Sequence, residues 1–271
     1  MPEAIDLTAF QPVHQGFSAV ISRSGPWLLR EPRSAEAQRR HDREADVLAV
    51  VADGLPVEVP AVESRIAPSP ERPYGAHLVR WLEGDEVDQT VDPASVAGFV
   101  DVLHGVDSAP IGGLVPSFGE WCRQQRKLEA AGLAALTGRV DDGLLSELGR
   151  LMKRLGDRIA DCPRPGVVHG DLWYGNLLMR DHRLTGVLDW EFAVIGDPLV
   201  DYAALWYLGD DFMAALLAAL GQSVLDLPET VRYYRVLREF TGLTWSIDNH
   251  DEEELRESVD KVADVAESVL S

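Results

Sequence analysis

Short apolar segments separated by turns occupy the first part of the chain. Residues 17–21 and 26–30 are two such segments, and the polar stretch between them predicts a hairpin. Residues 57–62 and 76–82 predict two more strands on either side of a proline-rich turn. The pattern therefore predicts a small antiparallel sheet near the amino terminus.

A helix is predicted between these two pairs of strands, over residues 34–51. Ser34 is a suitable N-cap, and Ala45, Leu48 and Ala49 fall on one helical face. Beyond Gly84 the apolar pattern becomes helical, with amphipathic stretches that include 93–103, 118–136 and 144–159. We therefore expect an α+β protein with a sheet-rich lobe over 1–84 and a mostly helical lobe over 85–271.

The larger predicted lobe also contains a compact strand-rich segment. Residues 166–168, 177–179 and 186–188 are short apolar runs bounded by glycine and polar residues. Helical patterns then continue to the end of the chain. We expect polar residues between these strands to gather at one end of a small sheet.

Composition and charge exclude several classes of protein. The formal net charge is −20 over 271 residues, which disfavours nucleic-acid binding. The acidity is uneven, with a net of −3 up to Gly84 and −17 from Asp85 onward. No apolar run is long enough to span a membrane, and the first residues do not resemble a signal peptide. With two cysteines and no disulfide framework, we expect a cytoplasmic protein with no membrane partner.

The chemistry-bearing segment runs from His169 to Asn176 and reads His-Gly-Asp-Leu-Trp-Tyr-Gly-Asn. Asp171 contributes a carboxylate, Asn176 an amide oxygen, and Asp189 a second carboxylate from the end of a later strand. Such hard oxygen ligands suit Mg²⁺ that also binds substrate phosphates. A further carboxylate can orient a hydroxyl and accept its proton. Phosphoryl transfer needs this set of groups.

This motif resembles the protein-kinase-like fold and, more closely, the aminoglycoside phosphotransferase family of small-molecule kinases. His-Gly-Asp at the loop start and Asp-Trp at 189–190 are typical of that family. The resemblance implies a bilobal kinase fold and transfer of the γ-phosphoryl group of ATP or GTP. It implies that Asp171 is the catalytic base, and that Asn176 and Asp189 hold Mg²⁺.

The resemblance also assigns nucleotide-binding residues in the first lobe. Gly16 and Ser18 lie where the family has its phosphate-covering loop. Arg30 occupies the position of the phosphate-gripping lysine, which is a departure, since the first lysine of the chain is Lys127. Glu44 matches the helix glutamate that pairs with this basic residue.

Residues 78–84 match the hinge between the lobes of the family. There the carbonyl of Arg80 and the amide of Leu82 would bind the nucleobase edge. Leu178 and Leu188 would supply apolar contacts to the base, and they also suit a buried core.

The acceptor is expected to be a small cationic molecule that carries a hydroxyl group. The resemblance implies an antibiotic of the aminoglycoside or viomycin type, with a macrolide as a further option, and the acidity of the larger lobe favours an acceptor with several ammonium groups. Acidic candidates for acceptor binding are Asp171, Asp210, Asp211, Asp251 and Glu252. A metabolic kinase for an amino alcohol, a sugar or homoserine is the alternative, as is a nucleotide-binding pseudokinase without chemistry. The sequence leaves the nucleotide preference and the oligomeric state open.

Overall fold

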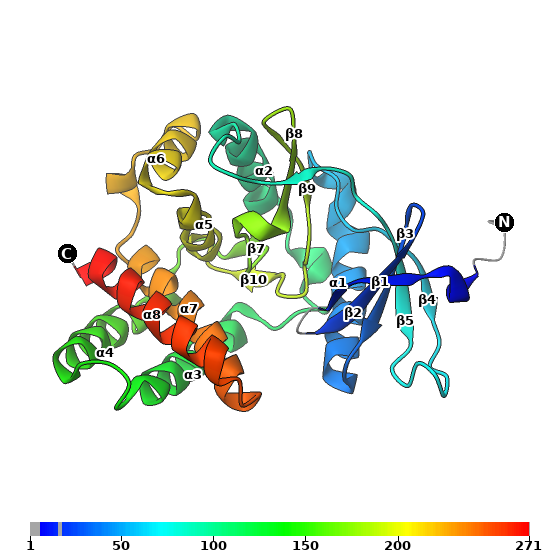
Figure 1. Ribbon diagram of the computed structural model, residues 1–271. Coiled ribbons are helices and arrows are strands. Elements are labelled where there is room, and N and C mark those ends of the chain that lie inside the picture. Colours follow the sequence, from blue (N-terminus) through cyan, green and yellow to red (C-terminus); the bar gives the residue numbers. More distant parts are fainter. Residues whose placement is uncertain (1–5, 16–17, 271) are drawn as a thin grey trace.

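A five-stranded antiparallel sheet forms the smaller lobe, at the right of Figure 1. The computed structural model describes residues 6–15 and 18–270. The strand order is β1-β2-β3-β5-β4, in which β5 is inserted between β3 and β4. The strands are β1 (Gln11–Gln15), β2 (Ala19–Ser24), β3 (Trp27–Pro32), β4 (Val62–Ile66) and β5 (Ala76–Arg80).

Helix α1 (Ala35–Val51) lies beside this sheet, but its apolar face belongs to the larger lobe. Its first turn is capped by the Ser34 hydroxyl, which accepts a hydrogen bond from the Ala37 amide at 3.1 Å. Val47 and Leu48 are buried in the same apolar cluster as Trp190. The sheet has a small core of its own around Leu29. Helix α1 is therefore anchored to the larger lobe.

The larger lobe is built mainly of helices packed around α7 (Thr230–Asp248), which contacts α3, α4, α5 and α8. At Gly132 of α3, an added Cβ would lie 2.2 Å from the Phe240 ring of α7, so only glycine permits this close approach. The other helices are α2 (Pro93–Gly105), α3 (Phe118–Leu136), α4 (Asp142–Gly156), α5 (Leu199–Leu205), α6 (Asp210–Ala219) and α8 (Glu252–Leu270). Single 3₁₀ turns are Leu7–Ala9, Ala52–Gly54, Ala109–Ile111, Ile159–Asp161, Tyr174–Asn176, Trp206–Leu208 and Val224–Asp226.

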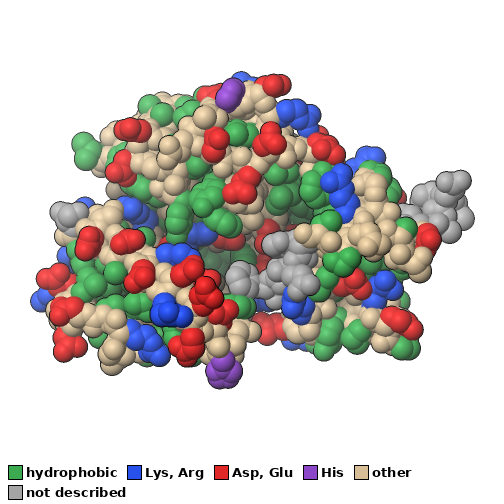
Figure 2. All heavy atoms as spheres, viewed as in Figure 1, with side chains coloured by type: hydrophobic (Ala, Val, Ile, Leu, Met, Phe, Trp, Pro, Cys, Tyr) green, Lys and Arg blue, Asp and Glu red, His purple; other side chains and the backbone are tan. Residues whose placement is uncertain are grey.

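Two small antiparallel sheets lie where the lobes meet. One pairs β7 (Gly166–Val168) with β10 (Val194–Gly196). The other joins β6 (Asp85–Glu86), β8 (Leu177–Arg180) and β9 (Arg183–Val187). The polar loop 169–176 connects β7 to β8, so it emerges between the two sheets. Figure 2 shows the surface hollowed between the lobes on this face.

The structure confirms the predicted fold and corrects some strand boundaries. The predicted strand 57–62 is wrong, because the strand of the main sheet is β4 at Val62–Ile66. The preceding segment pairs with β9 instead: the Glu58 amide donates to the Thr185 carbonyl, and the Glu58 carbonyl accepts from the Val187 amide. Strands β1 and β10 were not predicted, since one is polar and the other has three residues.

No helix in the described part of the chain is both long enough and apolar enough to cross a bilayer.

Candidate active site

The loop that carries Asp171 depends on a glycine with a left-handed backbone. Gly170 has φ of +81°, and an added Cβ would lie 2.6 Å from the Phe192 carbonyl oxygen. A side chain at this position would therefore collide with a rigid backbone atom. The chain turns sharply here, directly after β7, and Asp171 follows in the next position.

Asp201 of α5 fixes the start of this loop from inside the protein. Its side chain is fully buried, and its carboxylate accepts hydrogen bonds from the His169 amide at 3.0 Å and the Gly170 amide at 2.9 Å. The His104 ring lies 3.0 Å from the same carboxylate. A buried carboxylate with several donors is well satisfied. Asp201 therefore braces the loop and lies behind the reacting groups.

The His169 ring also holds the loop in place, through two hydrogen bonds. Its Nδ1 accepts a hydrogen bond from the Asp171 amide at 3.2 Å, and its Nε2 lies 2.8 Å from the Leu188 carbonyl. Because Nδ1 is an acceptor here, Nε2 carries the proton and donates it to Leu188. The ring thus ties the loop to the residue before Asp189.

Both oxygens of the Asp171 carboxylate are engaged. The Asn176 side-chain amide donates to Oδ2 at 3.0 Å and to the Asp171 carbonyl at 2.9 Å. The other oxygen, Oδ1, accepts a hydrogen bond from Nη1 of Arg238 at 2.6 Å. Sequence reasoning places Asp171 with Asn176 but does not anticipate Arg238, which lies 67 positions along the chain on α7.

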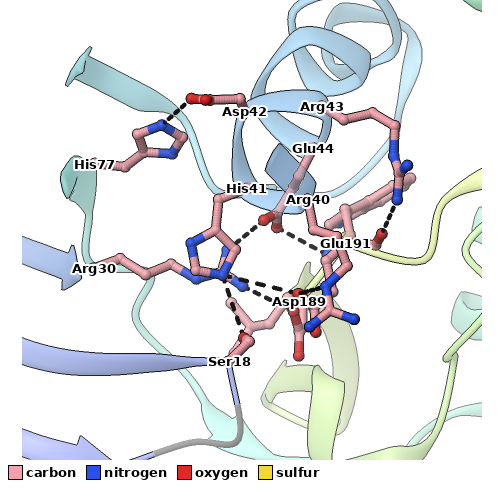
Figure 3. Close-up of polar contacts among 12 residues, drawn as sticks. Ser18, Arg30, Arg40, His41, Asp42, Arg43, Glu44, His77, Asp189 and Glu191 are labelled. Carbon is pink, nitrogen blue, oxygen red and sulfur yellow. Dashed lines mark hydrogen bonds and ion pairs between the residues drawn. The ribbon is translucent and has the colours of Figure 1, made fainter. Parts of the chain in front are cut away.

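Asp189 follows β9 in a left-handed conformation, with φ of +58°. Nη2 of Arg30 lies 3.1 Å from its Oδ1, and Nη1 of Arg30 donates to Glu44. The Trp190 amide in turn donates to Glu44 at 3.0 Å. Figure 3 shows these side chains converging from β3, α1 and the end of β9. The structure therefore brings together Arg30, Glu44 and Asp189 as one chain of ion pairs.

Burial and ion pairing together set the charges of Arg30 and Glu44. Burial disfavours the charged guanidinium of Arg30, but Glu44 and Asp189 more than offset it, so the pKa of Arg30 is raised. Burial raises the pKa of the Glu44 carboxyl, against the attraction of Arg30. A guanidinium held between two carboxylates has a defined position.

A second polar cluster continues from Asp189 toward β2 (Figure 3). The Ser18 hydroxyl lies 3.3 Å from Nε2 of His41, which lies 3.8 Å from the Glu191 carboxylate. Burial, helped by Arg30, lowers the pKa of His41 to about 3, so its ring is neutral at pH 7. Burial and the charge of Asp189 raise the pKa of Glu191 to about 7. Ser18 is thereby linked to the segment after Asp189.

The remaining predicted nucleotide-site residues lie along the junction of the lobes. Leu82 is buried and Arg80 is exposed at the end of β5. Leu178 and Leu188 are half-buried, and the Leu188 amide donates to the Asn176 carbonyl at 2.8 Å. Gly16 lies outside the described residues. The roles of these residues in binding a nucleotide stay predictions.

The acidic acceptor candidates lie at two helix starts. Asp210 accepts a hydrogen bond from the Trp206 ring nitrogen at 2.6 Å, and Asp211 beside it is exposed. Asp251 accepts from the amides of the first turn of α8, and Glu252 is exposed there. Figure 2 shows acidic side chains gathered along α8. Acceptor binding by these residues stays a prediction.

The smaller lobe has two cavities. Their volumes are about 330 and 450 Å³, and Tyr74 lines both of them. Neither is lined by Asp171, Asn176 or Asp189.

The donor set at the loop fits Mg²⁺. Asn176 directs its nitrogen at Asp171, so its side-chain oxygen is the atom left for a cation. The Asp189 side chain is 38% exposed, so its carboxylate is open to a ligand. Among the described residues no three His, Cys, Asp or Glu side chains form a metal cluster. Mg²⁺ in proteins is commonly bound by one or two carboxylates together with substrate phosphates.

Residues 9–240 match the model of the phosphotransferase enzyme family, also called APH. This match covers most of the chain. The chain belongs to this family. The membership confirms the family resemblance carried by the His169–Asn176 motif and by Asp189.

Solved structures of the family share the fold. The GDP and kanamycin complex of APH(2″)-IIIa superposes with a TM-score of 0.81, at 19% identity, over 97% of this chain and 95% of that one. Macrolide 2′-phosphotransferase type I gives 0.71 at 24% identity, over 93% and 90%. The macrolide 2′-phosphotransferase of Brachybacterium faecium gives 0.68 at 21% identity, over 95% and 93%.

Two curated proteins also match this chain. An uncharacterized protein of Bacillus subtilis, YcbJ, is 24% identical over 82% of this chain and 70% of its own length. Acyl-CoA dehydrogenase family member 10 of Mus musculus is 28% identical over 43% of this chain. The matched part spans about a tenth of the length of the mouse protein.

Proposed function

We propose that this protein transfers the γ-phosphoryl group of ATP or GTP to a hydroxyl of a small molecule. One observation carries the proposal. Asp171 and Asn176 are bonded together on one loop, while Arg30, Glu44 and Asp189 form a connected chain of ion pairs at the junction of the lobes. Phosphoryl transfer relies on positioning and on charge stabilisation, and this arrangement supplies both.

Asp171 acts as the base in this reaction. Its Oδ2 is held by the Asn176 amide, so the carboxylate has a fixed direction. The acceptor hydroxyl binds at this carboxylate and gives up its proton to it as the new bond to phosphorus forms. Gly170, His169 and Asp201 keep the loop in place through their hydrogen bonds.

The nucleotide binds between the lobes. Mg²⁺, held by Asn176 and Asp189, would supply charge neutralisation for the phosphates. Arg30 binds phosphate oxygens with its guanidinium while Glu44 holds it in position. The backbone of Arg80 and Leu82 binds the nucleobase edge, Leu178 and Leu188 contact its faces, and the loop at Gly16 and Ser18 covers the phosphates.

The acceptor we propose is a cationic antibiotic. Family members of known structure include an aminoglycoside phosphotransferase bound to kanamycin and macrolide phosphotransferases. The net charge of −17 beyond Gly84, with acids gathered along α8, favours an acceptor that carries ammonium groups. Asp210, Asp211, Asp251 and Glu252 are the candidates to meet those groups.

A transfer assay read by mass spectrometry tests the proposal. The protein is incubated with Mg²⁺, ATP and GTP, and a panel of aminoglycosides, macrolides, viomycin-type peptides and amino alcohols. We expect a product heavier by one phosphoryl group, about 80 Da. The Asp171→Ala variant should be slower by about 10²–10⁴-fold. Glu147→Ala, an exposed change on α4, is the matched control and should transfer at the parent rate.

The outcomes separate the candidate functions. Product from an antibiotic supports the full proposal, and product from an amino alcohol or another metabolite would assign a metabolic kinase instead. No product with any acceptor, together with no nucleotide hydrolysis, contradicts the enzyme and leaves a nucleotide-binding protein without chemistry. An Asp171→Ala variant as fast as the parent would contradict the role of the base.

A further inference from the structure

Arg238 is a half-buried cation that contacts the proposed base directly. It lies in the middle of α7 (Thr230–Asp248), and its side chain is 20% exposed. Its Nη1 donates to Oδ1 of Asp171 at 2.6 Å. Asn176 binds the other oxygen of the same carboxylate. Arg238 therefore lies within one hydrogen bond of the place where the acceptor hydroxyl must bind.

The guanidinium of Arg238 is held charged and in position. Burial disfavours its charge, but the contact with Asp171 more than offsets this, and the pKa of Arg238 is raised. The rings of Tyr207 and Trp173 lie 5.3 and 6.0 Å from it, on different elements. Tyr207 and Glu239 are the other polar groups that face it, and they bond to each other. The group is thus preorganised before any substrate arrives.

Among the described residues, Arg238 is the cation that contacts Asp171. The loop His169–Asn176 contains no lysine or arginine. Arg30 comes from the smaller lobe and is bonded to Glu44 and Asp189, on the nucleotide side of the loop. In the proposed transfer, a phosphoryl group moves from a nucleotide near Asp189, which Arg30 contacts, to a hydroxyl at Asp171, which Arg238 contacts.

We propose that Arg238 is a catalytic residue that binds the γ-phosphoryl group during transfer. This inference rests on the proposed function. The acceptor oxygen forms a bond to the γ-phosphorus, its proton passes to Asp171, and the bond to the β-phosphate oxygen breaks, with its electrons leaving on the nucleoside diphosphate. Arg238 exchanges Oδ1 of Asp171 for a phosphoryl oxygen, which frees that carboxylate oxygen for the hydroxyl.

The chemistry of the guanidinium suits this exchange. It has five N–H donors in a planar fork, which is more than one carboxylate oxygen can use. Charge on the transferring phosphoryl group is spread over its three equatorial oxygens, and arginine is well suited to meet it. A rigid cation aimed at this charge stabilises the transition state with little reorganisation.

Nucleotide turnover with water as the acceptor tests this role without knowledge of the natural acceptor. Phosphate release from MgATP and MgGTP is measured for the parent, Arg238→Gln and Arg238→Lys from pH 6 to pH 10. We expect Arg238→Gln to lower kcat about 10²–10³-fold, with KM for the nucleotide within about threefold of the parent. Arg238→Lys keeps the charge and should recover part of the loss. Arg235→Gln, one turn earlier on α7, is the matched control.

A binding measurement gives a second readout. MgADP with aluminium fluoride imitates the transferring phosphoryl group, and calorimetry compares its affinity with that of MgADP alone. We expect Arg238→Gln to weaken only the aluminium fluoride complex, by about 10²-fold. Equal effects on both ligands would contradict the proposal.

The two readouts together separate catalysis from positioning. If Arg238 acted only by positioning Asp171, its loss would lower kcat but leave the affinity for MgADP with aluminium fluoride at the parental value. That result, or a parental rate in Arg238→Gln, overturns the inference while the proposed function stands. A parent protein that shows neither turnover nor transfer overturns both.

Discussion

Replacing Asp201 should both destabilise the protein and impair the proposed chemistry. In Asp201→Ala, the amides of His169 and Gly170 lose their buried acceptor, and the His104 ring loses its partner. A buried donor left without a partner costs about 1–3 kcal/mol, and three donors lose their acceptor here. Because these contacts share one carboxylate, their losses do not add fully. We expect a loss of about 4 kcal/mol in the free energy of unfolding.

Urea denaturation followed by tryptophan fluorescence measures this loss. Asp201→Asn keeps the shape of the side chain but points an N–H group at one of the loop amides, so it should also lose stability. Asp264→Asn, an exposed change on α8, should stay within about 0.5 kcal/mol of the parent. A loss of less than about 1 kcal/mol in Asp201→Ala would refute the bracing role.

The phosphoryl transfer rate of the Asp201 variants provides a second test. If the loop moves by about an ångström, the phosphoryl transfer rate should fall about 10²-fold, even where the variant is fully folded. The nucleotide affinity should change little, since Asp201 lies behind the loop. An Asp201→Asn variant that is destabilised but transfers at the parental rate would show that the carboxylate supports the fold alone.

Three further predictions follow from the geometry. Gly170→Ala should unfold at a lower urea concentration and lose activity, because Gly170 has φ of +81° and lies close to the Phe192 carbonyl. Gly149→Ala, in an open stretch of α4, should instead raise the free energy of unfolding by up to about 1 kcal/mol, and equal effects of the two changes would contradict the close approach. Glu44→Gln should raise KM for the nucleotide about tenfold by loosening Arg30, and kinetics with an unchanged KM would argue against this pairing. Burial and Asp197 raise the pKa of the Cys162 thiol from 9.0 to about 11. At pH 8 this thiol should therefore react with iodoacetamide about 10²-fold more slowly in the folded protein than in urea, and equal rates would contradict the raised pKa.

Elements with a complete local signal could be predicted from the sequence. Ser34 and the apolar face of 35–51 define α1, and the structure begins and ends this helix as predicted within one residue. The helix predicted over 118–136 matches α3. The strand predicted at 57–62 was wrong, because its pairing with Thr185 and Val187 of β9 depends on residues more than a hundred positions away. Local patterning carries no information about that partner.

The site shows the same division between local and distant information. Asp171 and Asn176 share one loop, so their spacing predicts their contact, which the structure shows. Arg238 comes from a helix far along the chain, where an arginine in an amphipathic pattern indicates a solvated face. The regular spacing of Arg232, Arg235 and Arg238 on α7 was the one available signal. It marks a basic stripe, but only the packing of α7 shows which of the three arginines meets the loop.

The attachment of α1 to the larger lobe determines which kind of contact joins the two lobes. Val47 and Leu48 share a core with Trp190, so apolar packing joins this helix to the larger lobe. The five-stranded sheet has a separate core around Leu29 and contacts the helix through polar groups, Arg30 with Glu44 and His77 with Asp42. The polar boundary between the two cores therefore lies between β3 and α1, well before the point where the chain itself passes from one lobe to the other.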